Sequence, residues 1–181
     1  QHNHFLRRCR GFRMDIVVFG AGSIGSLFGA LLARVPDHSV TLVGREPHVA
    51  AVRDAGLRVT GVDEFVVRPA VTTDGTDLSA DLALVTVKAF DTEAAAEELA
   101  TGAFRAVCSL QNGMGNEETL ARHLECPVLA GTTSYGAVRE SPGTVAWNGR
   151  GDVVVGPWEP TDATGVAEEV GEAFAAADLS T

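Results

Sequence analysis

The chain has 181 residues, of which 45% are hydrophobic and 21% are charged. This balance is typical of a globular protein with one sizeable core, and the length is too short for two full domains. No apolar run approaches the roughly 18 residues that a membrane-spanning helix needs, and a formal net charge of −10 argues against the basic surface that nucleic acids require. We therefore expect a soluble protein that binds neither membranes nor nucleic acid.

The first thirteen residues differ from the rest because they hold four arginines and no acidic residue. They lack the apolar segment of a secretory signal and begin at Gln1 instead of methionine, so Met14 is the expected start of translation. Residues 1–13 are then a disordered basic extension, with a transit segment as the alternative interpretation. His2 and His4 belong to this extension and are not expected to bind a metal.

The three cysteines of the chain, Cys9, Cys108 and Cys126, form no closely spaced pair. Their odd number and wide spacing predict neither a disulfide framework nor a zinc site. A reducing, cytoplasmic location is the simpler expectation.

Strands and helices alternate from Met14 to about residue 130. Each predicted strand is a short apolar run, and the helical patterns between them end near glycine, proline or a change of period. In chain order we expect a strand over 15–19, a helix to about 34, a strand over 39–43, a helix from 47 to 56, a hairpin over 57–60 and 65–71, a strand over 82–87, a helix over 92–100, a strand over 105–110, a helix over 116–124 and a strand over 127–130. Such alternation predicts an α/β fold with a doubly wound, mostly parallel sheet.

The chain changes character after residue 130. Three short, glycine-punctuated strands are expected over 136–140, 144–147 and 152–155, and this pattern predicts an antiparallel edge of the same sheet. Residues 162–177 show the period of an amphipathic helix, which is the last predicted element.

The strongest chemical signal is Gly20-x-Gly22-x-x-Gly25, placed where the first strand meets the first helix. Gly20 permits a tight turn, Gly22 lets backbone amides approach a pyrophosphate, and Gly25 allows the helix to pack closely on the strand. The positive end of the helix dipole also attracts anions. A strand before the motif and a helix after it favour dinucleotide binding over the alternative, a glycine-rich turn without a ligand.

The residue at the end of the second strand indicates which dinucleotide is bound. An NAD site would place Asp or Glu there to accept from the ribose 2′-hydroxyl, whereas this chain has Arg45. A guanidinium can hold a 2′-phosphate with two parallel hydrogen bonds, and a carboxylate would repel it. We therefore expect NADP(H) as the cofactor, with an unspecialised surface arginine as the alternative and Glu46 as a candidate ribose contact.

Two further side chains follow predicted strands on the same side of the sheet. Lys88, the sole lysine of the chain, follows the strand over 82–87, and Asn112 follows the strand over 105–110. Each alone has an ordinary interpretation, a solvated charge and a turn residue. Together, beside the place expected for a nicotinamide, a cation and an amide suit a substrate with a carbonyl or carboxylate group.

The segments GAGSIG, GR, LVTVKAF, QNGMG, GTTSYGAV, PGTVAWNG and VVVGP follow one another from Met14 to the end of the chain. In this order the pattern resembles the ketopantoate reductase (2-dehydropantoate 2-reductase) family. The resemblance implies that residues 14–181 form a Rossmann-like NADP-binding domain. It further implies reduction of 2-dehydropantoate to pantoate, a step of pantothenate and coenzyme A biosynthesis.

The resemblance also implies roles for particular residues. Arg45 would hold the 2′-phosphate, Lys88 and Asn112 would line the nicotinamide and substrate site, and Ala137 would touch the cofactor. The pyrophosphate would be held by Gly20, Ala21, Gly22, Ser23, Ile24 and Gly25.

Members of the family continue into a helical second domain, which supplies the proton donor and the side chains that bind substrate, and no such domain follows here. Delivery of a hydride to a ketone needs an acid at the developing alkoxide. We therefore expect this chain to bind NADPH and to turn over ketopantoate little or not at all by itself. The alternatives are a stand-alone, non-catalytic NADP-binding module and a reductase of another 2-oxo acid. Apolar surface left bare by the missing domain would favour association, as a homo-oligomer or with that domain.

Overall fold

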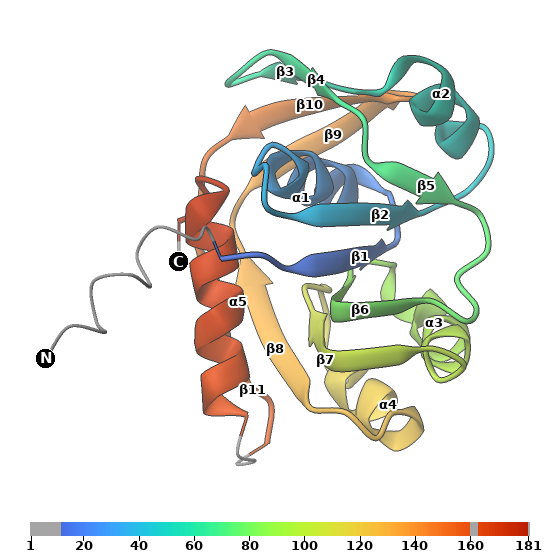
Figure 1. Ribbon diagram of the computed structural model, residues 1–181, viewed down its shortest axis with the longest axis vertical. Helices are drawn as coiled ribbons and strands as arrows, with labels where there is room; N and C mark the ends of the chain where they lie inside the picture. The colour runs from blue at the N-terminus through green and yellow to red at the C-terminus, as the bar shows by residue number, and fades with distance from the viewer. Residues whose placement is uncertain (1–11, 160–162, 181) are drawn as a thin grey trace, which may run out of the picture.

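The computed structural model describes residues 12–159 and 163–180 (Figure 1). Predictions for residues 1–11, including the basic extension, His2 and His4, lie outside the described residues, as does the predicted helix start at 162. The elements in chain order are β1 (Asp15–Phe19), α1 (Ser23–Ala33), β2 (Ser39–Val43), α2 (His48–Ala55), β3 (Leu57–Gly61), β4 (Phe65–Val67), β5 (Ala70–Thr72), β6 (Ser79–Val85), the 3₁₀ helix η2 (Ala89–Asp91), α3 (Thr92–Leu99), β7 (Ala103–Ser109), α4 (Asn116–His123), β8 (Val128–Thr133), β9 (Gly136–Ser141), β10 (Thr144–Gly149), β11 (Val153–Pro157) and α5 (Thr164–Ala176).

The main sheet has seven strands in the order β11-β8-β7-β6-β1-β2-β5, and all neighbours are parallel except β11, which runs antiparallel to β8. From β1 the chain first builds β2 and β5 on one side and then returns to build β6, β7 and β8 on the other. The doubly wound, Rossmann-like fold predicted from the sequence is confirmed. In such sheets ligands bind where the strand order reverses, which is here between β1 and β6.

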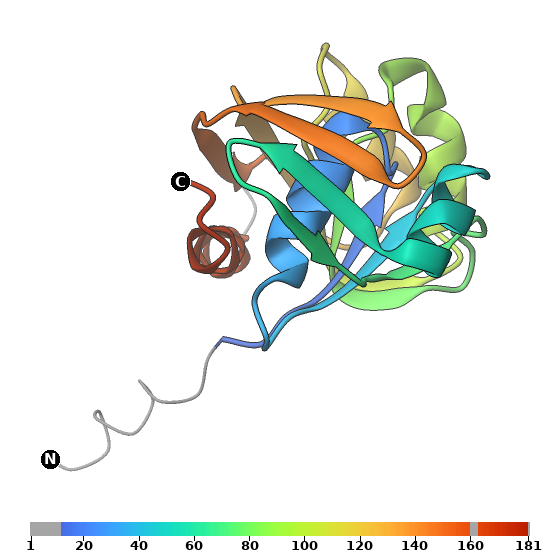
Figure 2. The same cartoon turned by 90° about the horizontal axis from the view of Figure 1, so that it is seen from above.

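The two faces of the main sheet are covered differently (Figure 2). Helices α3 and α4 pack on one face. On the other face α1 lies between the main sheet and a second sheet of four strands, in the order β4-β3-β10-β9, with α5 beside it. Among the described residues no helix is long and apolar enough to cross a membrane.

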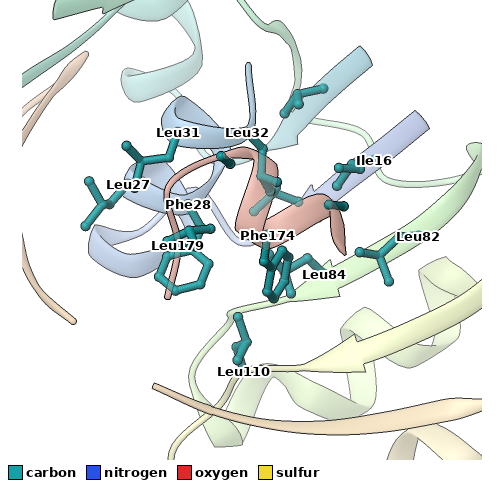
Figure 3. Close-up of a cluster of buried hydrophobic side chains, with 14 of the residues drawn as sticks. Ile16, Leu27, Phe28, Leu31, Leu32, Leu82, Leu84, Leu110, Phe174 and Leu179 are labelled. Atoms are coloured by element: carbon teal, nitrogen blue, oxygen red, sulfur yellow. The ribbon is translucent and has the colours of Figure 1, made fainter. Parts of the chain in front are cut away.

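The core is centred on α1, whose buried residues occupy most of its circumference. Phe28 of α1 meets Phe174 of α5 edge to face, with ring centroids 6.0 Å apart, and meets Tyr135 in the same way at 5.6 Å. Figure 3 shows Phe28 and Phe174 together with Leu84 from the main sheet. A helix that is apolar nearly all round has to be covered on several sides, and α5 and the second sheet provide that cover.

The predicted strand over 65–71 was wrong as one element. Residues Phe65–Val67 form β4, which pairs antiparallel with β3 as the predicted hairpin requires, whereas Ala70–Thr72 form β5, which pairs parallel with β2. Pro69 stands between them, and proline has no N–H to continue a ladder of hydrogen bonds. The segment therefore passes from one sheet to the other at this point.

The predicted antiparallel edge over 136–155 was also wrong in part. Only β11 joins the main sheet, whereas β9 and β10 form a hairpin in the second sheet, where β10 pairs parallel with β3. The inward residues of β10, Val145 and Trp147, are buried. They cover the side of α1 that faces away from the main sheet, and this burial places the hairpin there.

A smaller difference concerns the end of β6. The strand was expected over 82–87 but ends at Val85, so Thr86 and Val87 lie in the loop that follows. This loop is part of the site described next.

Candidate functional site

A cleft of about 290 Å³ lies at the carboxyl ends of β1, β2 and β6. It therefore occupies the place where the strand order reverses and where a fold of this kind binds its ligand. Its lining residues are Gly20, Ala21, Gly22, Gly44, Arg45, Thr86, Val87, Lys88, Phe90, Asp91 and Arg139.

The charges around the cleft are unusual for this chain. Arg45, Lys88 and Arg139 line it together with Asp91 as the one acidic residue, although the chain as a whole has a net charge of −10. A local excess of positive charge in an acidic protein favours an anionic ligand.

The glycine-rich turn is held by hydrogen bonds to the ends of both neighbouring strands. The N–H groups of Gly20 and Ala21 donate to Val43 O at 3.0 and 2.9 Å, and Gly22 N–H donates to Gly20 O at 2.7 Å. From the other side, the Thr86 hydroxyl donates to Gly20 O at 2.7 Å. The φ of +109° at Gly20 is a conformation that favours glycine. The turn is therefore fixed before any ligand binds.

The start of α1 offers hydrogen-bond donors to the cleft. In the described part of the chain nothing accepts from the N–H groups of Ser23, Ile24 or Gly25, and Gly22 provides no side-chain cap. No acidic residue occupies the first turn of the helix. Unpaired N–H groups and the helix dipole together form an anion-binding position. The structure thus gives the predicted GAGSIG cradle the donors that it needs.

The structure places the members of that cradle in different surroundings. Gly20, Ala21 and Gly22 line the cleft. Ile24 is partly buried against the core, and Gly25 is buried. Their contribution to a ligand is therefore restricted to the backbone.

Arg45 follows β2, and its side chain is 85% exposed. One of its terminal nitrogens, Nη2, lies 3.3 Å from Oδ2 of Asp91, at the end of η2. An ion pair between such exposed groups stabilises by only about 0–1 kcal/mol. Asp91 therefore orients the guanidinium toward the cleft without withholding it from a ligand.

Lys88 and Asn112 follow adjacent strands, as predicted, and both are exposed. Lys88 lines the cleft, whereas Asn112 does not. The carbonyl of Asn112 accepts a hydrogen bond of 3.2 Å from Asn116 Nδ2 at the start of α4. The structure therefore brings Lys88 to the glycine-rich turn and leaves Asn112 on the next loop along the sheet edge.

A buried network of amide and hydroxyl groups joins these two loops. Gln111 Nε2 donates to Val87 O at 2.9 Å and to the Thr92 hydroxyl at 2.8 Å, and that hydroxyl donates to Asn116 Oδ1 at 3.0 Å. Buried polar groups that are all paired hold one arrangement of the chain. The network thus fixes the loop of Lys88 relative to the loop of Asn112.

Sequence reasoning missed Arg139, which extends from β9 of the second sheet into the cleft. Its backbone N–H donates to Ser23 Oγ at 3.0 Å, and its Nη1 donates to Ala21 O at 3.3 Å. Ala137, the predicted cofactor contact, packs partly buried against the core and does not line the cleft. The two residues are two apart on one strand and therefore share a face. That alternation was the signal that could have identified Arg139.

A buried serine–histidine pair lies beneath the same region. The ring of His48 is held on both sides: Ser26 Oγ lies 3.1 Å from Nε2, and Gly143 N–H donates to Nδ1 at 3.0 Å. Because Nδ1 accepts, the neutral ring carries its proton on Nε2 and donates to Ser26. Burial, and to a lesser extent the nearby charge of Arg139, lower the pKa of His48 from its ordinary value of 6.5.

This lowered pKa predicts a pH dependence of stability. Below about pH 6.5 the unfolded chain binds a proton at His48 that the folded chain does not, so the free energy of unfolding decreases with falling pH, by at most about 1.4 kcal/mol per pH unit. The stabilisation is complete above that pH and is lost as the pH falls through the folded pKa. In His48→Gln this contribution is absent. Urea titrations at about pH 8 and about pH 5 should show a smaller loss for the variant, and equal losses would contradict the assignment.

Comparison with known proteins agrees with these features. The family model described as ketopantoate reductase PanE/ApbA matches residues 16–160. The 2-dehydropantoate 2-reductase of Pyrococcus abyssi is 36% identical over 171 residues, which are 93% of this chain and 55% of that protein. The chain thus spans about half the length of the curated relatives it matches.

Solved structures show the same pattern. The PanE/ApbA family ketopantoate reductase from Ralstonia eutropha JMP134 is similar with a TM-score of 0.82 and 34% identity, over 92% of this chain and 55% of that one. D-mandelate dehydrogenase, solved with NADH and anilino(oxo)acetate, gives a TM-score of 0.83 at 24% identity, over 92% of this chain and 55% of that one. The latter similarity supports the fold alone.

Proposed function

The chain belongs to the ketopantoate reductase PanE/ApbA family, and on that premise we propose that it is the NADP(H)-binding part of a reductase that converts 2-dehydropantoate to pantoate. The observation that carries this proposal is the cleft between β1 and β6, in which a rigid glycine turn, free helix N–H groups and three cationic side chains surround one space. Each part of NADP(H) has chemistry that fits a part of this cleft.

The pyrophosphate fits the turn that begins at Gly20. A side chain built at Gly22 would meet nothing within 4 Å, so the space in front of this residue is open. The unpaired N–H groups of Ser23, Ile24 and Gly25 supply donors to two phosphates, and glycine leaves room for them.

The adenosine half fits the side of the cleft toward β2 and α3. Arg45 is the proposed partner of the 2′-phosphate, because a guanidinium binds phosphate with two hydrogen bonds. An adjoining cavity of about 200 Å³ is lined by small apolar residues, among them Val43, Ala94 and Ala95. A flat, apolar adenine base suits such a surface.

The nicotinamide half is proposed to lie toward the ends of β6 and β7, beside Lys88 and Asn112, with Ala137 on the opposite side. The bound cofactor supplies a hydride to the keto carbon of the substrate. Lys88 offers a positive charge for a carboxylate or carbonyl oxygen, and Asn112 offers a neutral donor. The network of Gln111, Thr92 and Asn116 holds both loops in place.

The same edge exposes large apolar side chains. Phe90 in η2 is 78% exposed, and Met114 in the loop after β7 is 99% exposed. We propose that this surface is covered in the complete enzyme by the part of the relatives that this chain does not include, or otherwise by a second copy of the chain. Since the proton donor is proposed to come from that part, the chain by itself is expected to hold the cofactor without completing the reaction.

Titration of the purified chain with NADPH, followed by calorimetry, tests the cofactor proposal. We expect one NADPH per chain, and then no loss of NADPH absorbance above the blank rate when 2-dehydropantoate is added. Absence of binding to both reduced and oxidised NADP would refute the cofactor proposal. Rapid NADPH oxidation by this chain would instead refute the proposal that it lacks the proton donor.

A further inference from the structure

Arg139 reaches the cleft from a part of the chain that is distant in sequence from the other lining residues. It lies on β9, and its two hydrogen bonds to Ser23 and Ala21 attach the second sheet to the glycine-rich turn. Of the five N–H donors of its guanidinium, the described residues accept only from Nη1, at 3.3 Å. No carboxylate among the described residues lies within ion-pair distance of it. The guanidinium therefore has both charge and donors free for a ligand.

Arg139 and Arg45 stand at a common boundary. A second cavity, of about 380 Å³, adjoins the cleft, and Arg45 and Arg139 are the two residues that line both. The other residues of this second cavity are Glu46, Pro47, His48, Glu140, Ser141 and Pro142. A ligand group at this boundary would thus meet two guanidinium groups, one from each sheet.

The charge around Arg45 gives this arrangement a purpose. Arg45 is paired with Asp91 at 3.3 Å, so the pair together has no net charge. A phosphate monoester near neutral pH carries about −1.5 to −2. Arg45 alone would meet this group with Asp91 beside it, and a second guanidinium is needed to leave the site positive.

We propose that Arg139 binds the 2′-phosphate of NADP(H) together with Arg45, so that the two guanidinium groups enclose it. This inference rests on the proposed function, because it assigns a residue to the same cofactor site. It makes Arg139 a determinant of cofactor specificity in addition to its contact with the turn.

The test compares NADPH with NADH, which differ only in the 2′-phosphate. In Arg139→Gln the dissociation constant of NADPH should rise about tenfold to a hundredfold, while that of NADH changes little. Arg139→Lys keeps the charge and loses the fork of donors, so it should recover part of the lost NADPH affinity. Arg58→Gln is the matched control, since this arginine lies exposed on β3 and does not line the cleft. It removes one positive charge and should leave both affinities unchanged.

Two results would overturn the inference. Equal weakening of NADPH and NADH in Arg139→Gln would mean that the side chain acts only on the turn, through Ala21. Unchanged binding of both nucleotides would mean that it contacts neither. If Arg139→Gln does not fold, the same comparison is made with Arg139→Lys, for which a loss selective for NADPH is again required. Failure of the proposed function itself is distinct, because the unmodified chain would then bind neither nucleotide.

Discussion

Replacement of Gly22 by valine is expected to abolish binding of both NADPH and NADH while the chain stays folded. The φ of −81° at Gly22 is open to any residue, and a side chain there meets no protein atom within 4 Å. The valine methyl groups would occupy the space in front of the helix N–H groups. Loss of two or more charge-assisted hydrogen bonds corresponds to a reduction in affinity of more than about a hundredfold.

Gly25 is the matched comparison within the same motif, because its close neighbours are protein atoms. A Cβ at this position would collide with the Gly20 carbonyl oxygen and with the Thr86 hydroxyl, which are themselves hydrogen-bonded to each other. Gly25→Ala is therefore expected to lower the free energy of unfolding by about 3 kcal/mol. Calorimetric titration and urea denaturation of both variants separate the two effects. Normal nucleotide binding by Gly22→Val would place the phosphate site elsewhere, and full stability of Gly25→Ala would contradict the close contact.

Replacement of Arg45 by aspartate is expected to raise the dissociation constant of NADPH at least a hundredfold and that of NADH far less. Loss of the charge-assisted contact alone accounts for about tenfold to a hundredfold. The new carboxylate would also lie near Asp91, which is now 3.3 Å from the guanidinium, and both would repel the 2′-phosphate. For NADH the same carboxylate can accept a hydrogen bond from the ribose hydroxyl.

Arg53→Asp provides the control for this substitution. Arg53 lies on α2, is exposed, and does not line the cleft, so the variant changes the net charge by the same amount at a neighbouring place. Calorimetric titrations with NADPH and NADH should show the selective loss in Arg45→Asp only. Equal losses for both nucleotides in Arg45→Asp would remove the role of Arg45 at the 2′-phosphate.

Several features of the site could be predicted because they depend on short stretches of chain. The strand over 15–19, the glycines after it and the place of Arg45 at the end of the next strand follow from local period and turn chemistry. Lys88 was placed at a strand end in the same way. A parallel sheet brings such strand ends to one edge, so their proximity needed no further information.

What the sequence alone determined was therefore the order of elements, the doubly wound sheet and the half of the cleft built from successive strand ends. The tertiary structure decided which strands leave that sheet, because α1 is apolar on nearly all sides and β3, β4, β9 and β10 bury what the main sheet leaves exposed. Such pairing joins segments more than eighty residues apart, as Val59 and Val145 show. Arg139 and the Ser26–His48 pair acquire their positions only through it, since burial of distant apolar surfaces, and not local propensity, brings these side chains to the cleft.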